Sequence, residues 1–216
     1  MTDVELRDLV WAAGQRHCLD RESFRVAAGE TGIIVAADAV GTALADVLLG
    51  LARPSRGVVY VREVPVGERP HDESGIALVP AGGGLLPHLT VERNVAFGLG
   101  GKVTRRARRE RVAEVLGQLQ LTSLRRMRPH ELSLDQRLRV AVARAMCTPA
   151  GTAAVVVEDR GGRESCRVAV MTAAEQELAV LVITSMPGRA TEFPYEVQAS
   201  CQLFQPSGER TDATQP

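Results

Sequence analysis

Short apolar runs recur along the chain and predict its strands. They span residues 33–35, 58–61, 76–79, 154–157 and 180–184 and are rich in valine and isoleucine. Because each run is continuous rather than alternating, it is typical of a strand buried on both faces. Helical periodicity fills several of the intervals, over 42–51, 105–121, 134–146 and 164–178. This alternation predicts an α/β fold with a largely parallel sheet.

A second helical region lies in the middle of the chain, where residues 85–130 carry more helix signal than strand signal. Thr90 is suited to cap a helix whose first turn holds Glu92 or Arg93. We therefore expect a helical subdomain, over about 85–145, inserted in a single domain that spans 1–205. The chain beyond Pro187 is rich in Pro, Gln and Thr, and residues 206–216 are predicted to form a disordered tail.

The composition of the chain argues against several classes of function. The 26 Lys and Arg residues balance the 26 Asp and Glu residues, so no net field draws the chain to nucleic acid or anionic lipid. Aromatic residues make up only 3% of the chain, which argues against stacking platforms for single-stranded nucleic acid. No apolar run approaches the ~20 residues of a membrane span, and the start of the chain lacks the pattern of a signal peptide. We expect a cytoplasmic protein, held at the inner face of the cell membrane by a partner.

Four stretches, in order within residues 29–185, resemble sequences of the ATP-binding cassette (ABC) family. They read GLARPSRG at 50–57, LLPHLTVERNVAFG at 85–98, PHELSLDQRLRVAVARA at 129–145, and an apolar run at 153–157 that ends in Glu158 and Asp159. Each stretch is weak alone, but four in register indicate the fold. The resemblance implies a P-loop NTPase-like ABC ATPase fold, with a mostly parallel central sheet, antiparallel edge strands and a helical subdomain.

The phosphate-binding loop of that family is altered in this chain. The family pattern, GxxxxGK followed by Ser or Thr, holds phosphates through backbone amides and the lysine. Here the loop is one residue short, and either Thr42 or Gly41 stands where the lysine should be. Losing the lysine alone costs about 10- to 100-fold in affinity. The degenerate nucleotide-binding positions are Ala36, Ala37, Asp38, Gly41, Thr42 and Ala43, with Trp11 near the position that stacks on adenine. The alternative for the loop is a strand, turn and helix kept for packing only. The alternative for Trp11 is a tryptophan in the core or on the surface.

Other functional positions of the family are altered too. By the resemblance, Ala81 stands at the glutamine that senses the metal and the attacking water, and Ser185 at the histidine that contacts the γ-phosphate. The glycines at 82–84 predict a mobile connection. No dimer-forming loop is recognisable, since residues 161–163 occupy its place. The signature loop consists of Ser133, Leu134, Asp135 and Gln136. Leu134 and Asp135, a bulky and an acidic residue, replace the two glycines of the family pattern.

The carboxylate pair Glu158 and Asp159 departs least from the family. Two carboxylates at the end of a buried strand suit hydrated Mg²⁺ and the polarisation of a water, with Thr42 and Glu158 as the metal ligands. The order of the two carboxylates is inverted relative to the family, so the side chain at the position of the base is one methylene shorter. A displacement of about 1 Å costs on the order of 10²-fold in rate. Two solvated acids at a strand end are the alternative. We therefore expect ATP and Mg²⁺ to bind weakly.

A basic cluster follows the second stretch and consists of Lys102, Arg105, Arg106, Arg108, Arg109 and Arg111. A solvated helix face is one interpretation of this cluster. Contact with phosphate, acidic protein or lipid headgroups is the other. The helical lobe of the ABC family faces the membrane permease, so the resemblance places the cluster near the membrane.

Three hypotheses of function follow. The leading one is a non-hydrolysing partner or regulatory subunit of a membrane transport complex, paired with a transmembrane permease, an intact ABC ATPase subunit, or both. A homodimer is an open alternative for its assembly. The second hypothesis is a divergent but working ATPase subunit that energises transport. The third is a stand-alone regulator that binds nucleic acid through the basic cluster, which the neutral net charge disfavours.

Overall fold

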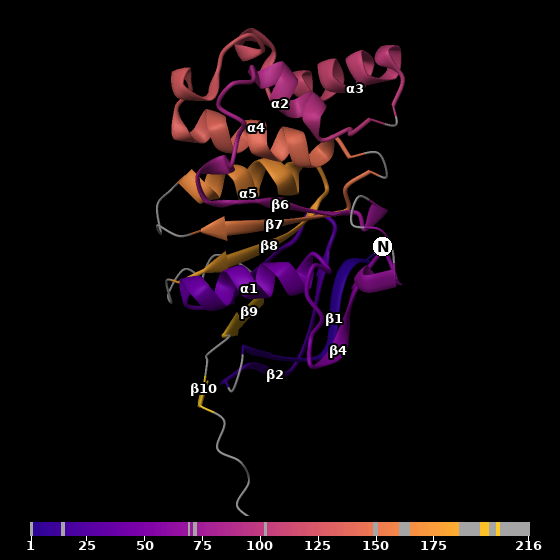
Figure 1. Cartoon of the computed structure of the whole chain (residues 1–216), viewed down its shortest axis with the longest axis vertical. Coiled ribbons are helices and arrows are strands. Elements are labelled where there is room, and N and C mark those ends of the chain that lie inside the picture. The colour runs from indigo at the N-terminus through magenta and orange to yellow at the C-terminus, as the bar shows by residue number, and fades with distance from the viewer. Residues whose placement is uncertain are drawn as a thin grey trace, which may run out of the picture.

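The chain is built around two five-stranded sheets (Figure 1). This computed structural model describes residues 2–13, 16–68, 70, 73–101, 103–148, 151–159, 165–185, 195–198 and 202–203. One sheet is parallel, in the order β6-β7-β8-β3-β9. Its strands are β3 (Thr31–Val35), β6 (Ile76–Val79), β7 (Ala154–Asp159), β8 (Ala179–Thr184) and β9 (Tyr195–Gln198). Four of the five predicted runs lie here, and β8 is buried along its whole length.

The second sheet is antiparallel and has the order β10-β2-β1-β4-β5. Its strands are β1 (Thr2–Ala13), β2 (Arg16–Ala27), β4 (Arg56–Val61), β5 (Val64–Pro65) and β10 (Gln202–Leu203). The antiparallel strands that the resemblance implied therefore form a sheet of their own.

The expectation that residues 58–61 form a strand buried on both faces is wrong. In β4, Val59 and Val61 are buried, whereas Val58 is 37% exposed. The ring of Tyr60 lies under the guanidinium of Arg7, 4.4 Å from its centroid. Val58 and Tyr60 occupy the outer face of β4, so the sequence shows a continuous apolar run although successive side chains alternate between the outer and the buried face.

Five α-helices accompany the sheets in the described part of the chain. They are α1 (Asp38–Leu48), α2 (Val91–Phe97), α3 (Arg105–Gln118), α4 (Leu134–Met146) and α5 (Ser165–Glu175). Short 3-10 turns occupy Val66–Glu68, Ala81–Gly83, Thr122–Leu124 and Pro129–Glu131. Thr90 caps α2 as predicted, with its hydroxyl accepting a hydrogen bond from the amide of Arg93 at 3.4 Å. None of these helices combines the length and the apolar character that a bilayer span requires.

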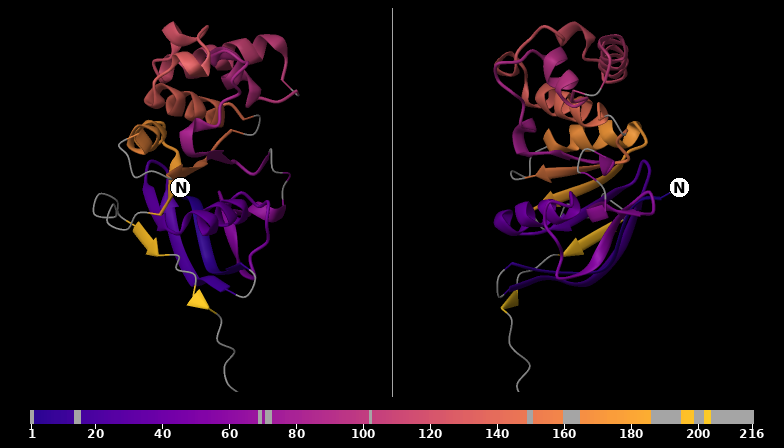
Figure 2. Two further views of the ribbon diagram at one scale, coloured as in Figure 1. Left: turned by 60° about the vertical axis from the view of Figure 1, so that its left-hand side comes forward. Right: turned by 45° about the vertical axis from the view of Figure 1, so that its right-hand side comes forward.

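The parallel sheet separates two hydrophobic cores. One face, with Val155, Val157, Val180 and Val182, packs with the helices α2 to α5. The other face packs with α1 and the antiparallel sheet and includes Ala154, Val156, Leu181 and Ile183. Figure 2 shows α2, α3 and α4 gathered at the end of the molecule opposite the antiparallel sheet. This arrangement leaves the carboxyl ends of β3, β7 and β8 beside the start of α1.

Candidate functional site

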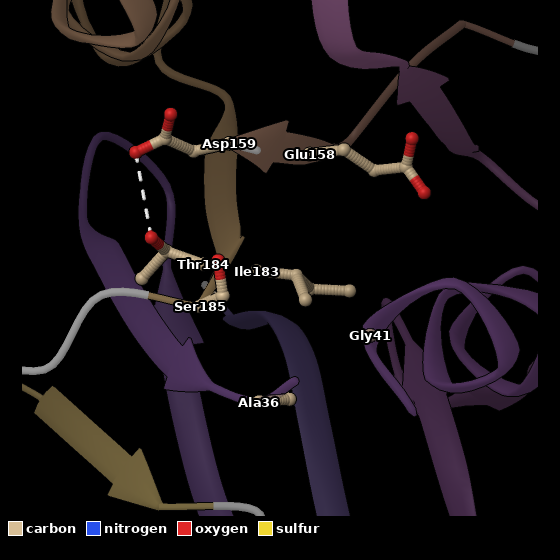
Figure 3. A pocket seen from close by; sticks show the side chains of 7 residues that line it. All are labelled: Ala36, Gly41, Glu158, Asp159, Ile183, Thr184 and Ser185. Carbon is tan, nitrogen blue, oxygen red and sulfur yellow. Dashed lines mark hydrogen bonds between the residues drawn. The ribbon is translucent and has the colours of Figure 1, made fainter. Parts of the chain in front are cut away.

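A small hollow lies where β3, β7 and β8 end next to α1 (Figure 3). Carboxyl ends of parallel strands are where open α/β folds bind their ligands. The space accessible to the centre of a water molecule is only ≈ 10 Å³, about the room one water needs. The structure thus gathers five of the predicted positions and adds Ile183 and Thr184, which the strand-end rule could have found. The residues lining the hollow are Ala36, Gly41, Glu158, Asp159, Ile183, Thr184 and Ser185.

The connection from β3 to α1 consists of Ala36 and Ala37 alone. The helix predicted over 42–51 in fact spans Asp38–Leu48, so Gly41 and Thr42 lie inside it rather than in a loop. The amide of Gly41 donates to the carbonyl of Ala37 at 2.8 Å, as in any helical turn. The early start has a physical reason, because a segment that is rich in alanine and contains a single glycine propagates a helix readily.

Gly41 holds α1 directly against the parallel sheet. A β-carbon at this buried position would lie 2.7 Å from Cγ2 of Ile183 in β8, closer than carbon atoms pack. The neighbouring Thr42 is exposed, and Ala43 packs on the core beneath α1. The side chains of Asp38 and Trp11 lie outside the described part of the structure.

The two carboxylates at the end of β7 point in opposite directions (Figure 3), as successive strand residues do. Glu158 extends toward the side on which Gly41 lies and is half-buried. Asp159 is buried, and its carboxylate accepts a hydrogen bond from the hydroxyl of Thr184 at 3.4 Å. The described residues contain no cluster of three His, Cys, Asp or Glu side chains that could hold a metal ion. Because their side chains point apart, Glu158 and Asp159 do not converge on a single point in this structure.

The signature residues build the start of α4 and lie outside the hollow. The hydroxyl of Ser133 accepts a hydrogen bond from the amide of Gln136 at 3.2 Å, and Oε1 of Gln136 accepts one from the amide of Ser133 at 2.9 Å. This reciprocal capping box satisfies two backbone donors at the helix terminus. Leu134 is 38% exposed, and Asp135 is also exposed. Helix capping thus accounts for Ser133 and Gln136 without a nucleotide.

The glycine segment after Ala81 forms a 3-10 turn that contacts α4. Ala81 begins a 3-10 turn and is exposed, and glycines 82–84 all have positive φ angles of 75°, 87° and 52°. Arg144 of α4 donates from Nη1 to the carbonyl of Gly84 at 2.8 Å and from Nη2 to that of Gly83 at 3.2 Å. These two hydrogen bonds hold the segment against α4. Ser185 is exposed at the end of β8, and residues 161–163 lie outside the described residues.

The basic cluster is partly neutralised within the chain. Arg106 pairs with Glu110 at 2.8 Å. Arg111 pairs with Glu114 at 3.0 Å, and Arg108 donates to the carbonyls of Ala96 and Gly100. The remaining arginines, Arg105 and Arg109, are exposed. Lys102 lies outside the described part of the structure.

The chain matches known proteins over most of its length. Residues 19–153 match the family model described as "ABC transporter". The putrescine transport ATP-binding protein PotG of Escherichia coli K12 is 32% identical over 145 residues, which are 66% of this chain and 38% of that protein. The trehalose/maltose import ATP-binding protein MalK of Thermococcus litoralis is 36% identical over 154 residues, 68% of this chain and 41% of that protein. The chain thus spans less than half the length of these curated relatives.

Solved structures from ABC transporters share the fold of this chain. An ATP-binding cassette of an ABC transporter in its ADP conformation has a TM-score of 0.71 and 18% identity, covering 92% of this chain and 87% of that one. The protein cbiO1 from Clostridium perfringens, part of the ABC transporter complex cbiONQ, has a TM-score of 0.69 and 18% identity over 85% of this chain and 78% of that one. These identities support the fold alone, and they confirm the expected ABC ATPase fold. The match to the family model over residues 19–153 shows that the chain belongs to the ABC transporter family.

Proposed function

We propose that this chain is a non-hydrolysing subunit of a membrane transport complex, retained for contact with a partner. The observation that carries the proposal is the closed phosphate position. A two-residue connection leads from β3 into α1, and Gly41 lies against Ile183 where a phosphate loop would stand open. A hollow with room for about one water does not admit a triphosphate.

The chemistry of the altered residues also supports the proposal. Nothing in residues 36–43 supplies the lysine that reaches the outer phosphates in a working loop. Leu134 and Asp135 would present an apolar side chain and a carboxylate to a nucleotide held by a partner subunit. Asp159 is engaged with Thr184 rather than directed at the side where Glu158 lies. Each change weakens nucleotide binding or catalysis separately, so their combination favours loss of hydrolysis.

The partners of this subunit follow from its relatives. PotG and MalK are named as transport and import ATP-binding proteins, which makes a transmembrane permease, an intact ABC ATPase subunit, or both, the expected partners. A similar solved cassette is described as dimeric and bound to ADP and Pi, so a homodimer is the competing assembly. In either case the chain would act at the inner face of the cell membrane.

Mg-ATP binding is the direct test. A site filled at 100 times its dissociation constant adds about 2.7 kcal/mol of stability, which would raise the melting temperature of a chain of this size by about 5–10 °C. We expect no such rise at millimolar Mg-ATP, and no release of phosphate above the background of a matched Glu158→Gln preparation. A melting shift of that size, or hydrolysis abolished by Glu158→Gln or Asp159→Asn, would refute the proposal.

The second candidate function is a divergent working ATPase. One observation favours it, since the Glu158 carboxylate lies on the same side of β7 as the start of α1, where a hydrated Mg²⁺ would sit. Isolation of the chain from solubilised membranes would identify its partners. An intact ATP-binding subunit among them agrees with the first function, whereas a permease with this chain as its sole cassette favours the second.

A further inference from the structure

A basic groove lies along the outer side of α3, away from the hollow at the strand ends. We call it the arginine groove and define it by its lining residues, all of them exposed, which border an open hollow of ≈ 620 Å³: Glu92, Arg105, Arg106, Arg109, Glu110, Ala113 and Arg125. The walls of this hollow carry four guanidinium groups and two carboxylates. The groove is therefore suited to a charged occupant.

Three of the four guanidinium groups have no partner within the described chain. Arg106 is paired with Glu110. Arg105, Arg109 and Arg125 make no side-chain hydrogen bond or ion pair with any residue that the structure describes. The groove thus holds an excess of positive charge that is available to an outside ligand.

The fold brings these arginines together from two separate segments. Arg105 and Arg109 lie four residues apart on α3 and share one face of the helix. Arg125 follows the 3-10 turn Thr122–Leu124, and its carbonyl accepts a hydrogen bond from the amide of Glu92 at 3.0 Å. That bond holds the backbone of Arg125 beside the start of α2, which sets Arg125 on the same groove as Arg105 and Arg109.

The placement of these arginines does not serve the stability of α3. The first turn of α3 contains no acidic residue, although the helix dipole favours negative charge there and disfavours cations. An arginine-rich first turn is therefore unfavourable for the isolated helix. An anionic partner would offset this effect, which supports a binding role for the cluster.

We propose that the arginine groove binds an acidic segment of a partner protein, a helix or loop that presents at least two carboxylates to Arg105, Arg109 and Arg125. The planar guanidinium fork matches a carboxylate with two parallel hydrogen bonds. The chain as a whole carries no net charge, which disfavours an extended polyanion such as a nucleic acid or an anionic bilayer, whereas a segment with two carboxylates needs only these three arginines. This inference goes beyond the proposed function and holds whether or not the chain hydrolyses ATP.

Peptide binding to the purified chain at low salt tests the proposal. The probe is a fluorescent 16-residue helical peptide with glutamates four residues apart, compared with the same peptide carrying glutamine. We expect the glutamate peptide to bind and the glutamine peptide not to bind. Arg105→Gln with Arg109→Gln should weaken binding about two- to thirtyfold, because each exposed ion pair contributes about 0.2–1 kcal/mol and two pairs are lost. The control, Arg53→Gln with Arg56→Gln, removes two exposed charges outside the groove and should bind like the unmodified chain.

Charge reversal sharpens the test. Arg105→Glu with Arg109→Glu should bind a lysine version of the peptide and reject the glutamate version. Since both residues are exposed and glutamate suits a helix N-terminus, this variant should melt no lower than the unmodified chain. Equal binding by the groove variants and the unmodified chain would overturn the proposal. So would retention of duplex DNA or phosphatidylserine vesicles through Arg105 and Arg109 without binding of the glutamate peptide.

Discussion

Replacing Gly41 by alanine tests whether α1 packs directly against β8. The new β-carbon would lie 2.7 Å from Cγ2 of Ile183, a methyl group on a stiff β-branched side chain that cannot swing away. Overpacking of this kind costs about 1–3 kcal/mol. Alanine in a helix gains about 0.5–1 kcal/mol over glycine. We therefore expect a net destabilisation of about 1 kcal/mol, or roughly 2–4 °C in melting temperature for a chain of this length.

Gly117→Ala is the matched control for this substitution. Gly117 also lies in a helix, α3, but it is exposed and a β-carbon there meets no atom within 4 Å. The same helix preference then acts without a clash, so this variant should be stabilised by about 0.5–1 kcal/mol. The difference between the two variants isolates the contact with Ile183.

Thermal melting and urea unfolding of both variants supply the measurement. The two changes should have opposite signs, with a difference of about 1–3 kcal/mol between them. If Gly41→Ala instead stabilises the chain as much as Gly117→Ala does, α1 does not lie against β8. The closed phosphate position would then lose its structural basis.

Three further predictions concern groups that hold the chain together. Asn94 is fully buried, its Oδ1 accepts from the amide of Leu86 at 2.8 Å, and its Nδ2 donates to the carbonyls of Leu86, Leu89 and Thr90 at 3.1 Å each. Asn94→Ala should therefore cost about 2–4 kcal/mol in urea unfolding, and a loss below about 1 kcal/mol would contradict this role. Ser133→Ala removes the cap of α4 and should cost about 1 kcal/mol, whereas an unchanged urea midpoint would show that the capping box does not stabilise the helix. Burial raises the pKa of the Cys147 thiol from 9.0 to about 11; the unfolded chain loses this proton first, so stability should fall between about pH 9 and 11. The fall should be smaller in Cys147→Ala, and parallel pH profiles of the two proteins would refute the assignment.

Elements that are determined locally were predictable from the sequence. The helix expected over 134–146 has those bounds, and Thr90 caps α2 as its side chain predicts. Four apolar runs became strands of the parallel sheet. In these cases the periodicity and the capping chemistry of neighbouring residues are enough, because the deciding interactions lie within a few positions of one another.

The long hairpin of β1 and β2 was not predicted. Its apolar residues Val4, Leu6 and Leu9 are buried, but their spacing changes from two to three. Asp8 has a positive φ of 47°, and the pairing register shifts between Leu6 and Leu9. A bulge of this kind breaks the alternation by which a strand is recognised, so the hairpin is visible only once the partner strand is in place.

The sequence by itself determined four strands of the parallel sheet, the helices that follow them, the missing lysine and the altered signature residues. Only the tertiary structure decided how those residues meet. It sets Gly41 against Ile183, turns Glu158 and Asp159 to opposite sides of β7, and joins Arg125 to Arg105 and Arg109. The physical reason is the same in each case, since a local pattern fixes which face a residue occupies but not which distant element packs on that face.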